Sequence, residues 1–122
     1  MKQWTILIES VQIKFKLIIG IPEELREYGD KFINMENSTN ADNFVMQNDK
    51  GELLMAISRK SSTGMIVHES THMLWQIAEQ RGLSLTYESQ EWQAYMLQFI
   101  VSKVLEKYKQ YEDWRNRVLR GE

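Results

Sequence analysis

Two histidines and a glutamate lie close together near the middle of the chain, in the run His68-Glu69-Ser70-Thr71-His72. On a helix, side chains four residues apart project from the same face about one turn apart. Both imidazoles could then bind one Zn²⁺ at roughly 2.0–2.1 Å. Glu69 would lie to one side of the ion, where its carboxylate can take a proton from an activated water. This spacing predicts a zinc site whose chemistry is hydrolysis, with Glu69 as the general base.

An accidental match is the alternative interpretation of this pattern. A lone histidine on an apolar helix face is more often structural than metal-binding, but here both histidines of the chain fall inside the pattern. We put the chance of such a coincidence on the order of one in a few hundred, and short motifs always carry some false matches. The pattern therefore favours a metal site over a coincidence.

A third ligand is needed, because a catalytic zinc ion takes three protein ligands and one open position. The chain has no cysteine and no further histidine, so this ligand must be a carboxylate. Glu79 returns to the helix face of His72 but lies about 10 Å further along the axis, too far to share the ion. Glu88 and Glu91 remain, at the start of a following helix that returns toward the site. We favour Glu91; its alternative role is that of a first-turn acid stabilised by the helix dipole.

The helices that position these residues have recognisable ends. Ser61-Ser62-Thr63 can cap the helix that carries the histidines, and Gly82 suits its C-terminal end, with Leu83 available for the accompanying apolar contact. After a connection over residues 84–88, a third helix is predicted from near residue 89 to 112 or beyond. Its apolar residues recur at helical spacing: Trp92, Met96, Phe99, Ile100 and Val104.

The first half of the chain predicts a small sheet and one helix. Apolar alternation, Pro22 and the turn residues around Gly51 give the following elements: strands over 4–8 and 12–19, a helix from Pro22 to about residue 32, a polar loop over 34–43, and a hairpin of 44–46 with 53–57 around the turn 48–51. We therefore expect an α+β fold in a single domain over 1–122. Its sheet would be mainly antiparallel with three to four strands, packed on three helices, with zinc between the second and third helices.

Composition excludes several classes of function. Hydrophobic residues make up 43% and charged residues 26% of the chain, with a net charge of −2, so neither a nucleic-acid nor a membrane partner is expected. The absence of cysteine excludes thiol catalysis and cysteine-ligated zinc. The longest apolar run, over residues 17–21, is too short for a signal peptide or a membrane span. We expect a cytoplasmic protein, in a bacterium or a phage-infected host.

The order and spacing of the ligands resemble those of a known family. His68, Glu69 and His72, followed about twenty residues later by Glu91, resemble the gluzincin metallopeptidases of the thermolysin type. The stretch from Gly51 to Tyr95 looks more specifically like the small zincin-like proteins of phage and prophage genomes. That resemblance implies a zincin-like fold, a Zn²⁺ cofactor and a peptide or protein substrate.

Three stretches outside the histidine motif carry this resemblance. They are a hairpin strand (Gly51 to Ile57), a Gly-Leu loop (Gly82-Leu83), and a Glu-x-x-Ala-Tyr run (Glu91 to Tyr95). In these proteases the substrate lies along an edge strand beside the metal helix. The segment from Glu52 to Ser58 is the candidate for that strand, with a role as an ordinary core strand as the alternative.

The chain departs from the family at two supporting positions. Where the larger enzymes place an aspartate that orients a zinc histidine, this chain has Tyr95, which is either a hydrogen-bond partner of a ligand or a core aromatic. The larger enzymes also stabilise the tetrahedral intermediate with a distant histidine, and none remains here. Tyr87, Tyr95 or Arg59 would take that role, or it is unfilled.

Two other functional classes stay open. One is a non-catalytic zinc-binding interaction protein, for example a phage accessory protein, and the other is a hydrolase that acts on a non-peptide bond. A chain this small could also complete its cleft as a homodimer through Tyr108, Tyr111 and Trp114 on the third helix. Packing of those aromatics on their own domain is the alternative.

Overall fold

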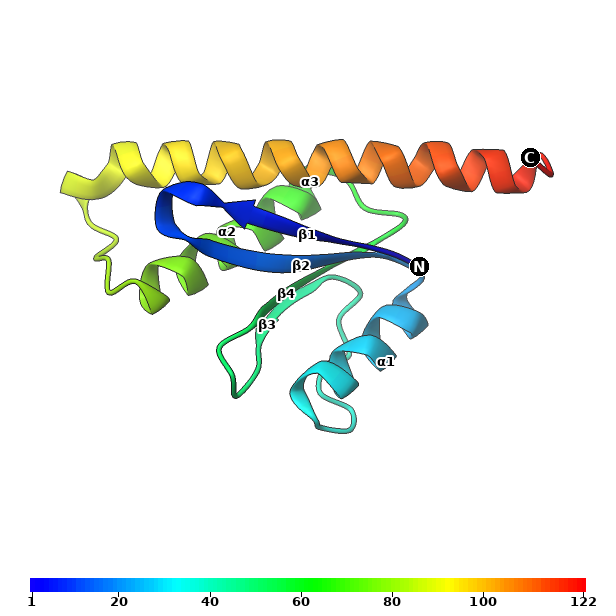
Figure 1. Cartoon of the computed structure of the whole chain (residues 1–122), viewed down its shortest axis with the longest axis horizontal. Helices are drawn as coiled ribbons and strands as arrows, with labels where there is room; N and C mark the ends of the chain where they lie inside the picture. Colours follow the sequence, from blue (N-terminus) through cyan, green and yellow to red (C-terminus); the bar gives the residue numbers. More distant parts are fainter.

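The computed structural model describes all residues, 1–122, and contains a four-stranded sheet with helices on both sides (Figure 1). The elements follow along the chain in this order: β1 (Lys2–Ile8), η1 (Glu9–Val11), β2 (Ile13–Gly20), α1 (Pro22–Ile33), β3 (Phe44–Gln47), β4 (Leu53–Ser58), α2 (Thr63–Gln80), η2 (Tyr87–Ser89) and α3 (Gln90–Leu119). The expected α+β class is confirmed, as are the three helices and the four-strand upper limit.

The sheet is mixed. Its strand order is β1-β2-β4-β3, with antiparallel pairs at both ends and a parallel pair, β2 with β4, in the centre. The parallel pair arises because α1 and the loop after it bring the chain back to the end of the sheet where β2 finishes, and β3 then runs in the opposite direction before the hairpin turn leads into β4. As a consequence β1 and β3 are the edges of the sheet, and β4 is internal.

Both faces of the sheet are covered. One face packs against α1, around Ile18, Leu25 and Leu54. The opposite face packs against α2 and α3, around Leu17 and Met55 among others. Every residue of β4 is buried, which explains its unbroken apolar sequence, since strands covered on both faces lose the polar alternation.

The ends of α2 are fixed as the sequence predicts. The Ser62 hydroxyl accepts a hydrogen bond from the Met65 amide at 3.2 Å, which satisfies one free donor at the helix N-terminus. At the other end Gly82 has a φ of +64°, and the Leu83 amide donates to the Ala78 carbonyl at 2.9 Å. This is the usual way a glycine ends a helix, and it sets where the chain turns toward α3.

The long helix α3 runs in roughly the opposite direction to α2 and extends past the sheet at its C-terminal end (Figure 1). Its buried residues are Met96, Ile100, Val104 and Tyr111. Tyr108 and Trp114 pack against the same core. The terminal aromatics therefore pack on their own domain, and a homodimer built on them is not supported. No helix combines the length and apolar character that a membrane crossing needs.

Candidate metal centre

The two histidines of α2 face each other. Their Nε2 atoms are 3.3 Å apart, and the rings are inclined at 74° with centroids 4.9 Å apart. Two nitrogens bound at 2.0–2.1 Å to a tetrahedral ion are about 3.3–3.4 Å apart. Both side chains are exposed, so their nitrogens are open to solvent. His68 and His72 thus have the separation of two ligands of one zinc ion.

Glu69 lies under this pair. It is 7% exposed, and its Oε2 is 4.0 Å from Nε2 of His68. Burial raises the pKa of the Glu69 carboxyl, while the neighbouring His68 and His72 act in the opposite direction. A buried carboxyl beside two imidazoles is in position to accept and release a proton.

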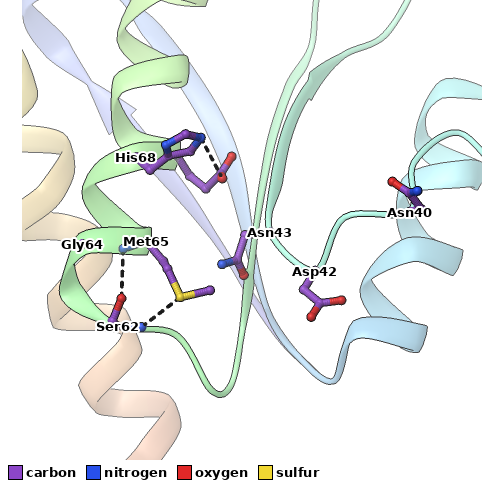
Figure 2. Close-up of a pocket in the computed structure, with 8 residues that line it drawn as sticks. Asn40, Asp42, Asn43, Ser62, Gly64, Met65 and His68 are labelled. Carbon is purple, nitrogen blue, oxygen red and sulfur yellow. Dashed lines mark hydrogen bonds and ion pairs between the residues drawn. The ribbon is translucent and has the colours of Figure 1, made fainter.

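An open cavity of about 680 Å³ lies between the N-terminal half of α2 and the loop before β3 (Figure 2). Its lining is polar apart from one methionine, and consists of Asn40, Asp42, Asn43, Ser62, Gly64, Met65, His68 and Glu69. His68 and the buried Glu69 carboxylate therefore share one cavity with three polar loop residues. Sequence reasoning placed residues 34–43 in a loop but did not connect that loop to the site.

Asn43 is the most constrained of the loop residues. Its Oδ1 accepts hydrogen bonds from the Ser58 amide at 2.6 Å and from the Ser61 hydroxyl at 3.1 Å. The Ser58 amide can only donate, so the Asn43 atom that it contacts is the oxygen. The Nδ2 group has no protein partner and is turned toward α2 (Figure 2). Asn43 therefore offers an oriented donor in the cavity, and only the tertiary hydrogen bonds reveal it.

The loop that carries Asn43 is tied to α1. Asp30 accepts hydrogen bonds from the hydroxyl and the amide of Ser38 and from the Asn37 amide, and these bonds lower the pKa of the Asp30 carboxyl. Arg26 forms an ion pair with Asp42 at 2.9 Å. Both attachments hold the loop beside the cavity.

Glu91, the predicted third ligand, is not near the histidines. It is exposed in the first turn of α3 and makes no hydrogen bond or ion pair, and Glu88 is equally exposed. No three His, Cys, Asp or Glu side chains of the chain are placed to hold a metal ion together. The reason is the length of α2, which continues eight residues past His72, about 12 Å, before the chain turns.

The other predicted supporting residues also lie elsewhere. Tyr87 is 80% exposed and Tyr95 is 68% exposed, and Tyr95 lines a different cavity, beside Trp92. Arg59 lies in the connection between β4 and α2, where its carbonyl accepts a hydrogen bond from Tyr108 at 2.6 Å. None of the three lines the cavity that contains His68 and Glu69.

The predicted substrate strand is also corrected. The segment from Glu52 to Ser58 contains β4, which lies between β2 and β3 with both edges paired. No backbone groups remain there for a peptide, because the hydrogen bonds of an internal strand are already used. The edge strand on this side of the sheet is β3, which Asn43 immediately precedes.

Comparisons with models of protein families, with curated proteins and with solved structures return no match for this chain. Interpretation of the centre therefore rests on its own geometry. Two imidazoles fit zinc, a buried carboxylate lies beside them, and the third ligand is missing from the arrangement within one chain.

Proposed function

We propose that the protein is a zinc-dependent hydrolase, a small metallopeptidase of zincin-like type. One observation carries the proposal: the two Nε2 atoms are 3.3 Å apart, and the buried Glu69 carboxylate is 4.0 Å from one of them. A structural histidine pair on a helix surface has no need of a buried acid beneath it. Burying an acid without hydrogen bonds costs stability, and a catalytic role gives a reason for that cost.

In this proposal each residue has a defined task. His68 and His72 hold the metal through Nε2, with the ring separation already correct in the folded chain. Bound zinc supplies Lewis-acid polarisation of a carbonyl and lowers the pKa of water. Glu69 takes the proton from the attacking water and passes it to the leaving amine. Its place beside the proposed ligands lets the same carboxylate serve both steps.

Asn43 fills the role for which Tyr87, Tyr95 and Arg59 were candidates. A tetrahedral intermediate needs hydrogen-bond donors aimed at its oxyanion. The Nδ2 group of Asn43 is free, oriented by two bonds to its own oxygen, and in the same cavity as Glu69. Among the donors that line this cavity, Asn43 is the one whose orientation is fixed by a hydrogen bond to its own oxygen.

An extended peptide is the substrate that the surroundings favour. Strand β3 (Phe44–Gln47) is an edge strand that begins at the cavity, and its outer backbone groups are free to pair with a peptide. Main-chain pairing would lead the peptide past Asn43 toward the histidines. The proposed substrate bed is therefore β3 rather than β4.

Metal analysis and proteolysis together test the function. We expect one zinc per chain by plasma mass spectrometry after equilibration with ZnCl₂, and cleavage of an unfolded protein such as reduced casein. Glu69→Gln should keep the metal and reduce cleavage by a factor on the order of 10³ or more. Glu79→Gln, on an exposed turn of the same helix, is the matched control and should cleave normally. Equal activity in wild type and Glu69→Gln would rule out the hydrolase.

A non-catalytic zinc-binding interaction protein is the second candidate. This candidate is favoured because no three histidine or carboxylate side chains of the chain lie close enough to hold one ion. A structural or bridging ion can take its remaining ligands from a partner. Stoichiometric zinc without any cleavage would select this candidate.

A further inference from the structure

The histidine pair belongs to an exposed stripe on α2. Met65, His68, His72 and Trp75 recur at helical spacing, and all four are exposed, Trp75 to 51% and Met65 to 41%. The Trp75 ring stands edge-on to His72, with centroids 5.6 Å apart. Large apolar side chains flanking two polar ligands are unusual for a solvated helix face, and tryptophan and methionine are enriched where proteins bind each other.

A second exposed patch surrounds Glu91. Glu91 and Tyr95 lie four residues apart on one face of the start of α3, and Tyr87 lies in the 3-10 turn η2 just before it. Leu83 and Leu85 in the preceding connection are also exposed, to 41% and 36%. The segment has two exposed carboxylates without partners, Glu88 and Glu91, among exposed aromatic and aliphatic residues, and it lies at the end of the molecule where α2 turns into α3 (Figure 1).

Glu91 could reach His68 and His72 of its own chain only if the start of α3 moved out of its packed position. Met96 and Ile100, about one and a half and two and a half turns further along α3, are buried in the core. The first turn is held by Gln93, whose Nε2 donates to the Thr86 carbonyl and the Ser89 hydroxyl, both at 2.9 Å. The glycine cap at the end of α2 fixes the turn on the other side.

We propose that a second copy of this chain completes the centre: His68 and His72 of one copy and Glu91 of the other bind the same zinc ion. In a two-fold symmetric pair each copy gives its histidines to one site and its glutamate to the other, which forms two equivalent centres. The stripe on α2 then packs against the patch around Glu91, and both sets of exposed apolar side chains are covered. This inference rests on the zinc site of the proposed function.

Zinc then controls assembly. Without metal the two surfaces offer only scattered apolar contacts and the chain is a monomer of 14.5 kDa. With zinc, binding and dimerisation are linked, so each promotes the other. The fourth coordination position stays open toward the cavity, as hydrolysis requires.

Sedimentation velocity with EDTA or with ZnCl₂ gives the first readout. Wild type should sediment as a monomer in EDTA and as a dimer with zinc, and Co²⁺ in place of zinc should give the intense visible bands of a tetrahedral site. Glu91→Gln should lower zinc affinity on the order of 100-fold or more, since even outer partners of ligands are worth 10–100-fold, and should abolish the dimer. Glu88→Gln, three residues away and equally exposed, is the matched control and should behave as wild type.

Mixing two variants, each lacking part of the proposed ligand set, shows whether the zinc site is formed between two copies or within one copy. Glu91→Gln keeps its histidines, and a His68→Ala/His72→Ala double variant keeps its glutamate. A mixed dimer has one intact centre, so the mixture should recover tight zinc binding, near one zinc per two chains, and should dimerise. If each site were internal, the mixture would bind no better than its separate components, and the inference would be overturned.

The failures of the two proposals are distinguishable. A zinc-bound wild-type monomer whose affinity is unchanged by Glu91→Gln would overturn the shared site alone and leave the hydrolase standing. Wild type that binds no zinc after equilibration with ZnCl₂ would overturn both proposals. If wild type and Glu69→Gln cleave equally while the zinc-linked dimer still forms, only the hydrolase proposal would be overturned.

Discussion

The side-chain amide of Asn43 has a structural role through its oxygen and a proposed catalytic role through its nitrogen. Its oxygen holds the connection between β4 and α2, and its nitrogen faces the cavity. Asn43→Asp preserves the two accepted hydrogen bonds but replaces the free donor with a second carboxylate oxygen. We expect kcat for peptide cleavage to fall about 10²–10³-fold, with a smaller change in KM, because a donor to the intermediate is lost.

Ser61→Ala is the control for this prediction. It removes the hydroxyl that contacts the Asn43 oxygen at 3.1 Å and the Ser58 carbonyl at 2.7 Å, and it leaves the Nδ2 group in place, so it should cost about 1 kcal/mol of stability with little change in kcat. Steady-state kinetics and thermal melting separate the two effects. Equal kcat values for the two variants would show that Asn43 is structural only.

Tyr108 is a second residue with two contacts on one atom. Its hydroxyl donates to the Arg59 carbonyl at 2.6 Å and accepts from the Ser61 amide at 3.2 Å, which joins α3 to the connection before α2. Tyr108→Phe leaves both backbone groups without this partner and should destabilise the protein by about 1–3 kcal/mol. Urea unfolding measures this, and an unchanged midpoint would mean that water replaces the hydroxyl at no cost.

For single residues, the sequence predicts which side chains lie together on one helix, but it does not predict which side chains from distant segments meet at the site. His68, Glu69 and His72 could be found because four-residue spacing on a helix needs no tertiary information. Asn43 could not be found, since its orientation depends on donors fifteen and eighteen residues away. Glu91 was selected by assuming a return of α3 to the histidines, and the length of α2 beyond His72 prevents that within one chain.

Among the elements, the loop over residues 34–43 depends on one side chain of α1. The bonds from Ser38 and Asn37 lower the pKa of Asp30, so its charged form stabilises the folded state. This contribution is present above the unfolded aspartate pKa of about 3.9 and disappears as the pH falls through the lower folded value. Asp30→Asn should therefore lower Tm at pH 7, and the difference from wild type should shrink below about pH 4.

Hydrogen exchange locates this effect. At neutral pH at least one of the Asn37 and Ser38 amides should lose protection in Asp30→Asn, because the two amides donate to different carboxylate oxygens and asparagine keeps only one acceptor oxygen. Asp49→Asn, in the exposed hairpin turn where the carboxylate makes no hydrogen bond, is the control. A pH-independent loss of Tm in Asp30→Asn would contradict the role of the charge.

The elements themselves could largely be predicted, because their ends are marked by local signals. Pro22 begins α1, Ser62 caps α2, and Gly51 and Gly82 adopt the positive φ that a turn and a helix end require. Strand order carried no such signal. The apolar run of β4 indicated a strand covered on both faces, and assigning it to the sheet edge contradicted that indication.

The arrangement of the whole molecule depends on contacts between distant segments, which is why the parallel pairing of β2 with β4 was not predicted. One such contact joins the two ends of the chain. Trp114 on α3 lies 5.6 Å from the buried Tyr111 ring, and the ammonium of Lys2 is 4.8 Å from the Trp114 ring. The amino group of Met1 pairs with Glu24 at 3.3 Å, which holds the start of β1 in place.

Truncation of α3 tests how far along the helix the residues still stabilise the folded chain. Removing residues 118–122 deletes only exposed side chains, including Val118 and Leu119, so Tm should change by no more than about 2 °C. Removing residues 114–122 also deletes Trp114 and its contacts with Tyr111 and Lys2, and should cost about 1–3 kcal/mol, or roughly 4–10 °C in Tm. Trp114→Ala in the full chain should reproduce that loss if the indole is responsible. A larger loss in the truncated chain would instead mean that the last turns of α3 stabilise the helix itself, because they add no other contact to the core.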